Sequence, residues 1–364
     1  MLNKNIITLT SRLTLTLIFT ITLKLVLTLL KYKRIVTRNK YLVLIFSDRN
    51  GKPSKDYKPT GYGGFCHNEH GYLQSLPVIA KFLNRKAVFP LPKNSLDRYH
   101  NNGKEVDYPW EKYLNIDKIN NLETNPPFSF SDNGDILTEL SIAYYPSNTP
   151  IHKMRKNVDV IALVNYNDGK SRLKTYSSLK QTPAINFLIK YNIKMNRYYT
   201  SDILKNYATQ IISKFKLENF TFIHIRRGDF LDNYSLAPPK GTRPYTSPQF
   251  ISNFIKIKKK INNKTIIIAT NEKNMDYKKK LVEYLDNYKI IFEEELINDL
   301  PTNILNDNYC IYLILHEIAK QSKINIGTCG YVRLGDKYTY RLAHYQTDLK
   351  LKRKIRDILE FYFL

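Results

Sequence analysis

The sequence predicts an α/β protein built on doubly wound parallel sheets, and three observations predict it. Short apolar runs alternate with segments of helical periodicity, most clearly after residue 220. Earlier in the chain, a strand, a glycine-rich loop, a helix and a second strand follow one another, which is one Rossmann-type unit. The chain has 364 residues, 43% of them hydrophobic, and is long enough for two domains of ordinary size.

The N-terminal segment is strongly apolar from Leu13 to Leu30. It approaches the minimum length of a membrane-spanning helix, basic residues flank it on both sides, and Lys24 is near enough to one end for its ammonium to reach the interface. No small-residue cleavage site follows, so the segment predicts an uncleaved anchor within residues 1–37; an amphipathic or core helix is the alternative. A single-pass membrane protein would face the Golgi or endoplasmic-reticulum lumen in a eukaryote, whereas a viral or bacterial source would allow the cytoplasmic face.

Residues 38–210 are expected to form the first domain. The apolar run Tyr41 to Phe46 predicts a buried strand, and the loop at 61–70 is rich in glycine. A helix is expected up to Leu83, and a second strand begins at Ala87. Loops with short helices are expected at 91–150, a strand at 158–164 and helical structure at 175–215.

Residues 211–364 are expected to form the second domain. Strands are predicted at 221–225, 265–269, 290–292 and 324–327, with helices between them. The helix that follows Ser247 has serine at its cap and Pro248 at its first position. This regular alternation favours a parallel sheet.

A cluster of charged residues follows the strand at 221–225. His224, Arg226, Arg227 and Asp229 stand there, and Gly228 allows a tight turn. Guanidinium groups bind phosphate bidentately and keep their charge at any working pH. Because ligands of open α/β sheets bind at the carboxyl ends of strands, the cluster predicts a diphosphate site. The structural alternative is a salt-bridge cluster on the surface.

The pattern H-x-R-R-x-D in this cluster resembles the donor-binding motif of the GDP-fucose-dependent fucosyltransferases, the α1,2, α1,6 and protein O-fucosyltransferase families. The resemblance implies the GT-B arrangement, in which two Rossmann-like domains face a cleft and the second binds the nucleotide. It implies inverting transfer of L-fucose from GDP-fucose to a glycan or protein hydroxyl. Arg226 would bind the β-phosphate and stabilise the leaving GDP. Arg227 would grip the diphosphate or orient the loop, Asp229 would order both guanidiniums, and His224 would contact the nucleoside side.

Two further segments extend the resemblance. At the strand end after 324–327, Thr328 and the backbone up to Gly330 would complete the phosphate cradle. In the glycine-rich loop, Cys66-His67-Asn68 stands where the family typically has Gly-Asn-Gln, and Asn68 would contact the donor. Glu69 or His67 could accept the acceptor's proton, although such a loop often only caps a helix. Weaker base candidates lie in the second domain, at Glu294, Asp307, His316 and Glu317.

No metal and no cofactor besides the donor are expected. The chain contains no Asp-x-Asp, the metal-binding signature of the other common glycosyltransferase fold, and arginine would replace the divalent ion as counter-charge. Its three cysteines make neither a zinc site nor a disulfide framework. The formal net charge is +25, but the excess is spread along the chain rather than clustered with aromatics, so nucleic acid is not an expected partner.

Three alternatives stay open at this point. One is a GT-B transferase that uses another nucleotide sugar. A second is a non-catalytic, basic, membrane-tethered binding protein. A third is a degenerate transferase that binds the donor without turnover, which the altered loop at 66–68 allows.

Overall fold

The structure is a computed structural model. It describes residues 22, 24, 39–47, 76–96, 101–104, 106, 108–119, 121–131, 136–146, 149, 153–154, 157–166, 200–228, 231, 243–257, 264–328 and 338–341.

The first half of the chain forms a four-stranded parallel sheet in the order β2-β1-β6-β5. Its strands are β1 (Tyr41–Ser47), β2 (Lys86–Val88), β5 (Ile142–Pro146) and β6 (Val160–Tyr166). Helix α3 (Leu76–Phe82) leads into β2, and the short helices α4 (Pro92–Ser95), α5 (Trp110–Tyr113) and η3 (Ile116–Lys118) follow. Strands β3 (Ser129–Phe130) and β4 (Ile136–Leu137) pair with each other as a small antiparallel sheet.

The second half forms a five-stranded parallel sheet in the order β11-β10-β7-β8-β9. Its strands are β7 (Phe220–Ile225), β8 (Thr265–Thr270), β9 (Lys289–Phe292), β10 (Ile324–Gly327) and β11 (Tyr338–Arg341). The helices of this half are α8 (Asp202–Lys214), η6 (Arg243–Tyr245), α9 (Pro248–Ile257), α10 (Met275–Tyr284), α11 (Glu293–Ile297), α12 (Thr302–Leu305) and α13 (Asn308–Gln321). The nearly all-buried strand β7 lies at the centre of the sheet.

Helices cover both faces of the second sheet. Side chains alternate along β7: Phe220 and Phe222 pack in the same core as α8 and α13, whereas Ile223 and Ile225 pack with α9 and α10. This alternation is the two-residue period of a strand whose two faces are both buried. The second half is therefore doubly wound.

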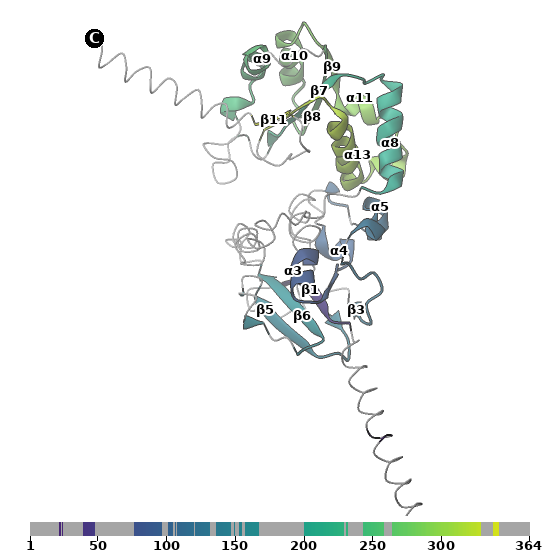
Figure 1. The fold of residues 1–364 in the computed structure, drawn as a ribbon. Helices are drawn as coiled ribbons and strands as arrows, with labels where there is room; N and C mark the ends of the chain where they lie inside the picture. Colours follow the sequence, from purple (N-terminus) through teal and green to yellow (C-terminus); the bar gives the residue numbers. More distant parts are fainter. Residues whose placement is uncertain are drawn as a thin grey trace, which may run out of the picture.

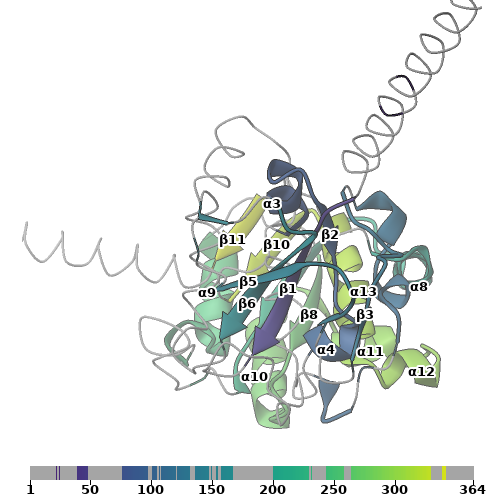
Figure 2. The ribbon, with the colours of Figure 1, turned by 90° about the horizontal axis from the view of Figure 1, so that it is seen from below.

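One apolar core runs from the first half of the chain into the second. It joins Leu42 of β1 and Tyr113 of α5 to Leu204 of α8 and Leu313 of α13. Helices α8 and α13 lie side by side in both Figure 1 and Figure 2. The ring of Tyr113 packs edge-on against that of Tyr309, with the ring centroids 6.4 Å apart. The two sheets are thus connected by packed side chains as well as by the chain itself.

The structure confirms the prediction of parallel α/β sheets and of the expected strands, which are β1, β2, β6, β7, β8, β9 and β10. It adds β5, which falls in the 91–150 region where loops and short helices were expected, and β11, which was not predicted. Both are edge strands of their sheets, where a short run suffices for pairing. The domain boundary expected after residue 210 falls inside α8.

The predicted anchor, Leu13 to Leu30, lies outside the described residues except for Thr22 and Lys24, which are helical. Within the part of the chain that the structure describes, no helix is both long and apolar enough to cross a membrane. Anchoring by this segment stays a prediction.

Candidate functional site

Strand β7 delivers the charged motif to the carboxyl edge of the second sheet. The neighbouring strands β8 and β10 run parallel to it and end at the same level, since His224 pairs in register with both Ala269 and Gly327. Residues that follow the three strands therefore meet at one edge, the usual ligand-binding position of a parallel sheet.

Thr328, directly after β10, fixes the backbone of the motif. Its hydroxyl accepts a hydrogen bond from the backbone N–H of Arg226 (2.7 Å) and donates one to the backbone carbonyl of His224 (2.8 Å). Its side chain is fully buried. In this structure the hydroxyl therefore positions Arg226, and the expected direct contact with a diphosphate stays a prediction that this geometry does not favour.

Asn271, directly after β8, holds the backbone of Arg227, the residue that follows Arg226. Its Oδ1 accepts from the backbone N–H of Arg227 at 2.7 Å. Gly228 then turns the chain with φ of +36°, and a Cβ on this glycine would lie only 2.5 Å from Nδ2 of Asn271. The turn after β7 therefore requires glycine for both its backbone angle and its close approach to Asn271.

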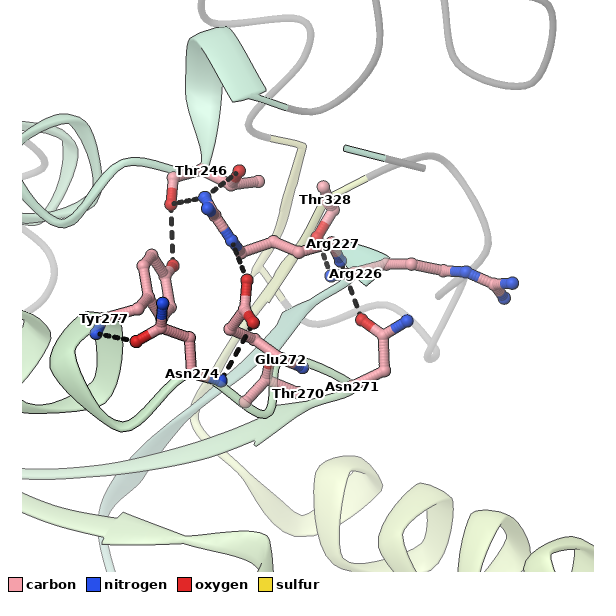
Figure 3. A network of polar contacts seen from close by, with 9 residues as sticks. All are labelled: Arg226, Arg227, Thr246, Thr270, Asn271, Glu272, Asn274, Tyr277 and Thr328. Carbon is pink, nitrogen blue, oxygen red and sulfur yellow. Dashed lines mark hydrogen bonds and ion pairs between the residues drawn. The ribbon is translucent and has the colours of Figure 1, made fainter. Parts of the chain in front are cut away.

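The side chain of Arg227 is buried within the protein and bound by it (Figure 3). Its Nε donates to Oε2 of Glu272 at 2.7 Å, and its Nη1 donates to the backbone carbonyl and the hydroxyl of Thr246 at 3.2 and 3.0 Å. The guanidinium carbon lies 4.1 Å from the ring centre of Tyr277, whose hydroxyl also donates to the carbonyl of Thr246. Of the two roles expected for Arg227, this network favours orientation of the loop over a grip on the diphosphate.

The side chain of Arg226 points the other way. Figure 3 shows it extended from the strand end in the direction opposite to Arg227, outside the network of Glu272, Thr246 and Tyr277. It is half-buried. The two adjacent arginines thus occupy different environments, and Arg226 is the one directed away from the protein's internal ion pair.

His224 is the residue before the last of β7 and is partly buried. Burial and, to a smaller extent, the positive charge of Arg226 together lower the pKa of His224 to about 4. The imidazole is therefore neutral at physiological pH and can act as a hydrogen-bonding group rather than a cation.

A partly buried carboxyl group lies at the same edge of the sheet. Glu293 follows β9, and its Oε1 accepts from the backbone N–H of Thr270 at 3.2 Å. Burial, together with the negative charge of the neighbouring Glu294, raises the pKa of Glu293 to about 7. Glu293, like Asn271, Glu272, Thr246 and Tyr277, was not among the predicted residues; applying the strand-end rule to β8 and β9 would have found three of them.

Five residues predicted for the donor and acceptor sites lie outside the described part of the chain: His67, Asn68, Glu69, Asp229 and Gly330. Their roles stay predictions. Among the residues that the structure does describe, no group of three or more His, Cys, Asp and Glu side chains could hold a metal ion.

Asp307, one of the weaker base candidates, is committed elsewhere. Its carboxylate is buried where the two halves meet and accepts from Tyr113 Oη at 2.8 Å and from Lys112 Nζ at 2.9 Å. It also caps α13 by accepting from the backbone N–H groups of Tyr309 and Cys310. These contacts account for its carboxylate without a catalytic role.

Comparison with known proteins gives only distant similarities. No protein-family model and no curated protein sequence matches this chain. Among solved structures, the fold is similar to POFUT1 in complex with GDP-fucose, with a TM-score of 0.45, 13% sequence identity and coverage of 84% of this chain and 98% of that one.

Two other solved structures resemble it at the same level. NodZ α-1,6-fucosyltransferase co-crystallised with GDP gives a TM-score of 0.41 at 9% identity, covering 80% of this chain and 88% of that one. A mutant of Arabidopsis thaliana FUT1 in complex with GDP gives a TM-score of 0.43 at 11% sequence identity, covering 82% of this chain and 69% of that one. All three TM-scores are below 0.5, so the similarities assign neither a family nor an activity.

Proposed function

We propose that this protein is an inverting, metal-independent glycosyltransferase that moves L-fucose from GDP-fucose to a glycan or protein hydroxyl. The observation that carries the proposal is the position of Arg226. It follows the central strand of a parallel sheet, its backbone N–H is held by Thr328, and its side chain extends away from the internal ion pair of its neighbour. The sequence around it keeps the H-x-R-R-x-D pattern of the GDP-fucose-dependent enzymes.

Arg226 supplies the charge that the reaction needs. As the bond between C1 of fucose and the β-phosphate oxygen breaks, the departing GDP gains negative charge, and a fixed guanidinium stabilises it. The acceptor oxygen forms the new bond to C1 from the opposite face, which inverts the configuration. The acceptor's proton passes to a base, for which Glu69 and His67 stay the candidates.

The neutral His224 suits the nucleoside side of the donor. An uncharged imidazole next to Arg226 can donate or accept a hydrogen bond without competing for the diphosphate. Asp229, Gly330 and Asn68 keep their proposed donor contacts. We also propose that the segment Leu13 to Leu30 tethers the enzyme to a membrane.

A second candidate function is binding of the donor without turnover. The altered sequence Cys66-His67-Asn68 favours it, because the acceptor-side loop departs from the family pattern while the arginine motif is kept. Transfer assays, rather than binding assays, separate the two candidates.

Donor selectivity is the experiment that tests the proposal. Calorimetric titration of the purified protein should show binding of GDP and GDP-fucose, and much weaker binding of UDP and UDP-sugars. Release or transfer of fucose should continue in excess EDTA. Equal affinity for UDP would remove the fucosyltransferase proposal, and activity that depends on added manganese would remove its metal-independent mechanism.

A further inference from the structure

We infer that Glu272 is a positioning residue for Arg226 and acts through the side chain of Arg227. The inference rests on the proposed function, since it takes Arg226 as the group that meets the donor. It assigns Arg227 to the protein interior and makes Glu272 responsible for the geometry of the strand end.

Arg227 depends on Glu272 for its charge balance. The arginine is 9% exposed, and a guanidinium stays charged at any working pH, so its burial requires a counter-charge. Glu272 provides one through the 2.7 Å contact between its Oε2 and Arg227 Nε. Thr246 and Tyr277 complete the enclosure with two hydrogen bonds and a stacked ring.

Glu272 is itself held by the backbone that follows β8. Its Oε1 accepts from the N–H of Asn274 at 3.0 Å, and its own N–H donates to the Thr270 hydroxyl at 3.1 Å. Burial raises the pKa of Glu272, but the hydrogen bond from Arg227 and those from the backbone outweigh burial and lower it. The carboxylate is therefore a charged and fixed attachment point for Arg227.

The attachment of Arg227 controls where Arg226 points, because the two residues share a peptide plane. Thr328 holds the N–H on one side of Arg226, and Asn271 holds the N–H of Arg227. The Arg227 side chain is the third constraint, and it extends in the direction opposite to the side chain of Arg226 (Figure 3). Releasing it would let the turn rotate, and a displacement of about 1 Å at a charge-stabilising group can cost about 100-fold in rate.

The competing assignment, in which Arg227 grips the diphosphate directly, predicts the opposite sign for one variant. If Glu272 merely sequesters a ligand-binding arginine, Glu272→Ala frees Arg227 and GDP binds more tightly. If Glu272 positions Arg226 through Arg227, the same variant weakens GDP binding.

The test compares GDP affinity and amide exchange in the full chain. We expect Glu272→Ala to weaken GDP binding by about 10-fold and to speed hydrogen exchange of the amides of Arg226 and Arg227. Glu272→Gln keeps a hydrogen-bond acceptor without the charge and should fall between wild type and Glu272→Ala, and it serves as the second variant if Glu272→Ala does not fold. Asp299→Ala is the matched control, since it removes an exposed ion pair with Lys214 in the same half of the chain.

A double variant that removes both Arg227 and Glu272 distinguishes the positioning role from a purely structural ion pair. Arg227→Met combined with Glu272→Met leaves no buried charge without a partner, so its melting temperature should recover toward wild type. Under the positioning role GDP affinity stays low in this double variant, whereas a purely structural pair would let affinity recover with stability. Unchanged or tighter GDP binding by Glu272→Ala overturns the inference and leaves the proposed function standing; a wild-type protein that does not bind GDP overturns both.

Discussion

Arg226 and Arg227 are neighbours in sequence, yet the structure gives them opposite environments. The guanidinium of Arg227 is enclosed by Glu272, Thr246 and Tyr277, and that of Arg226 is directed away from them. Charge alone does not distinguish the two, because both are permanently cationic. The distinction lies in which side chain the strand-end backbone directs inward.

Conservative substitution of each arginine should therefore have different effects. Arg226→Lys keeps the charge but loses the planar fork, and we expect kcat to fall by about 10² to 10³, equivalent to about 3–4 kcal/mol, with little change in melting temperature. Arg227→Lys should lower kcat less and the melting temperature more, because it disrupts a buried network. Steady-state kinetics and thermal denaturation of both variants measure this. Transfer near the wild-type rate in both, with intact folds, would mean that the motif is structural.

Gly228 is the other residue at which the turn makes a specific demand. We expect Gly228→Ala to destabilise the protein by about 2–3 kcal/mol, since it combines a positive φ with a Cβ placed 2.5 Å from Asn271. Gly103→Ala is the matched control: Gly103 has φ of +79°, but a Cβ there meets nothing within 4 Å. Urea denaturation should show a smaller loss for Gly103→Ala, and equal losses would show that the contact with Asn271 is unimportant.

Glu293 predicts a defined pH dependence. Its pKa is raised to about 7 in the folded protein, while the unfolded carboxyl releases its proton near 4.5. The folded state therefore binds more protons between these values, and this residue's contribution makes stability fall as pH rises from about 4.5 through 7. Glu293→Gln removes that contribution.

Unfolding free energies at pH 5 and pH 8 measure the effect. The fall from pH 5 to pH 8 should be smaller in Glu293→Gln than in wild type by about 2–3 kcal/mol. The lowered pKa of His224 acts with the opposite sign, but it is present in both proteins and cancels in the comparison. Glu283→Gln, at an exposed position of α10, should behave as wild type; an identical profile for Glu293→Gln would disprove the buried-acid interpretation.

At the scale of elements, α10 and α13 each begin with a side-chain cap. Asn274 accepts from the backbone N–H of Tyr277 at the start of α10. Asp307 caps α13 and, with the same carboxylate, binds Tyr113 and Lys112 of the first half. The start of α13 is therefore both a helix end and a joint between the two halves.

This double role predicts unequal costs for the two caps. Asn274→Ala should destabilise by about 1 kcal/mol, the usual loss for a cap. Asp307→Ala should cost about 3–5 kcal/mol, because it also removes the acceptor of the buried Tyr113 hydroxyl and of the partly buried Lys112 ammonium. Denaturant unfolding of the two variants gives the comparison, and similar losses would show that the contacts between the halves contribute little.

At the scale of the whole molecule, the two sheets share one apolar core. Residues of β1, α3 and α5 belong to the same packed cluster as residues of α8, β7 and α13. Such continuity couples the unfolding of one half to that of the other. The boundary expected between residues 210 and 211 is therefore not a break in packing.

A single cooperative transition is expected for this reason. Scanning calorimetry should give one endotherm. GDP at about 100 times its dissociation constant should increase the free energy of unfolding by about 2.7 kcal/mol and move the whole endotherm to higher temperature. Tyr113→Phe should lower the transition temperature without splitting the peak, since it removes one hydrogen bond and keeps the ring. Two separate endotherms, with only one shifted by GDP, would contradict this coupling.

The sequence by itself determined the α/β class, the strands β1, β2, β6, β7, β8, β9 and β10, and the position of the arginine motif at a strand end. These depend on local signals, namely apolar runs, helical periodicity and the charged residues that follow a strand. The roles within the site were decided only by the tertiary structure. The partners of Arg227 and Arg226 lie far along the chain, since Glu272 is 45 residues from Arg227 and Thr328 is 102 residues from Arg226. Periodicity carries no information on contacts at such separations, and only the parallel order β10-β7-β8 brings those residues to one edge and directs one arginine inward and the other away.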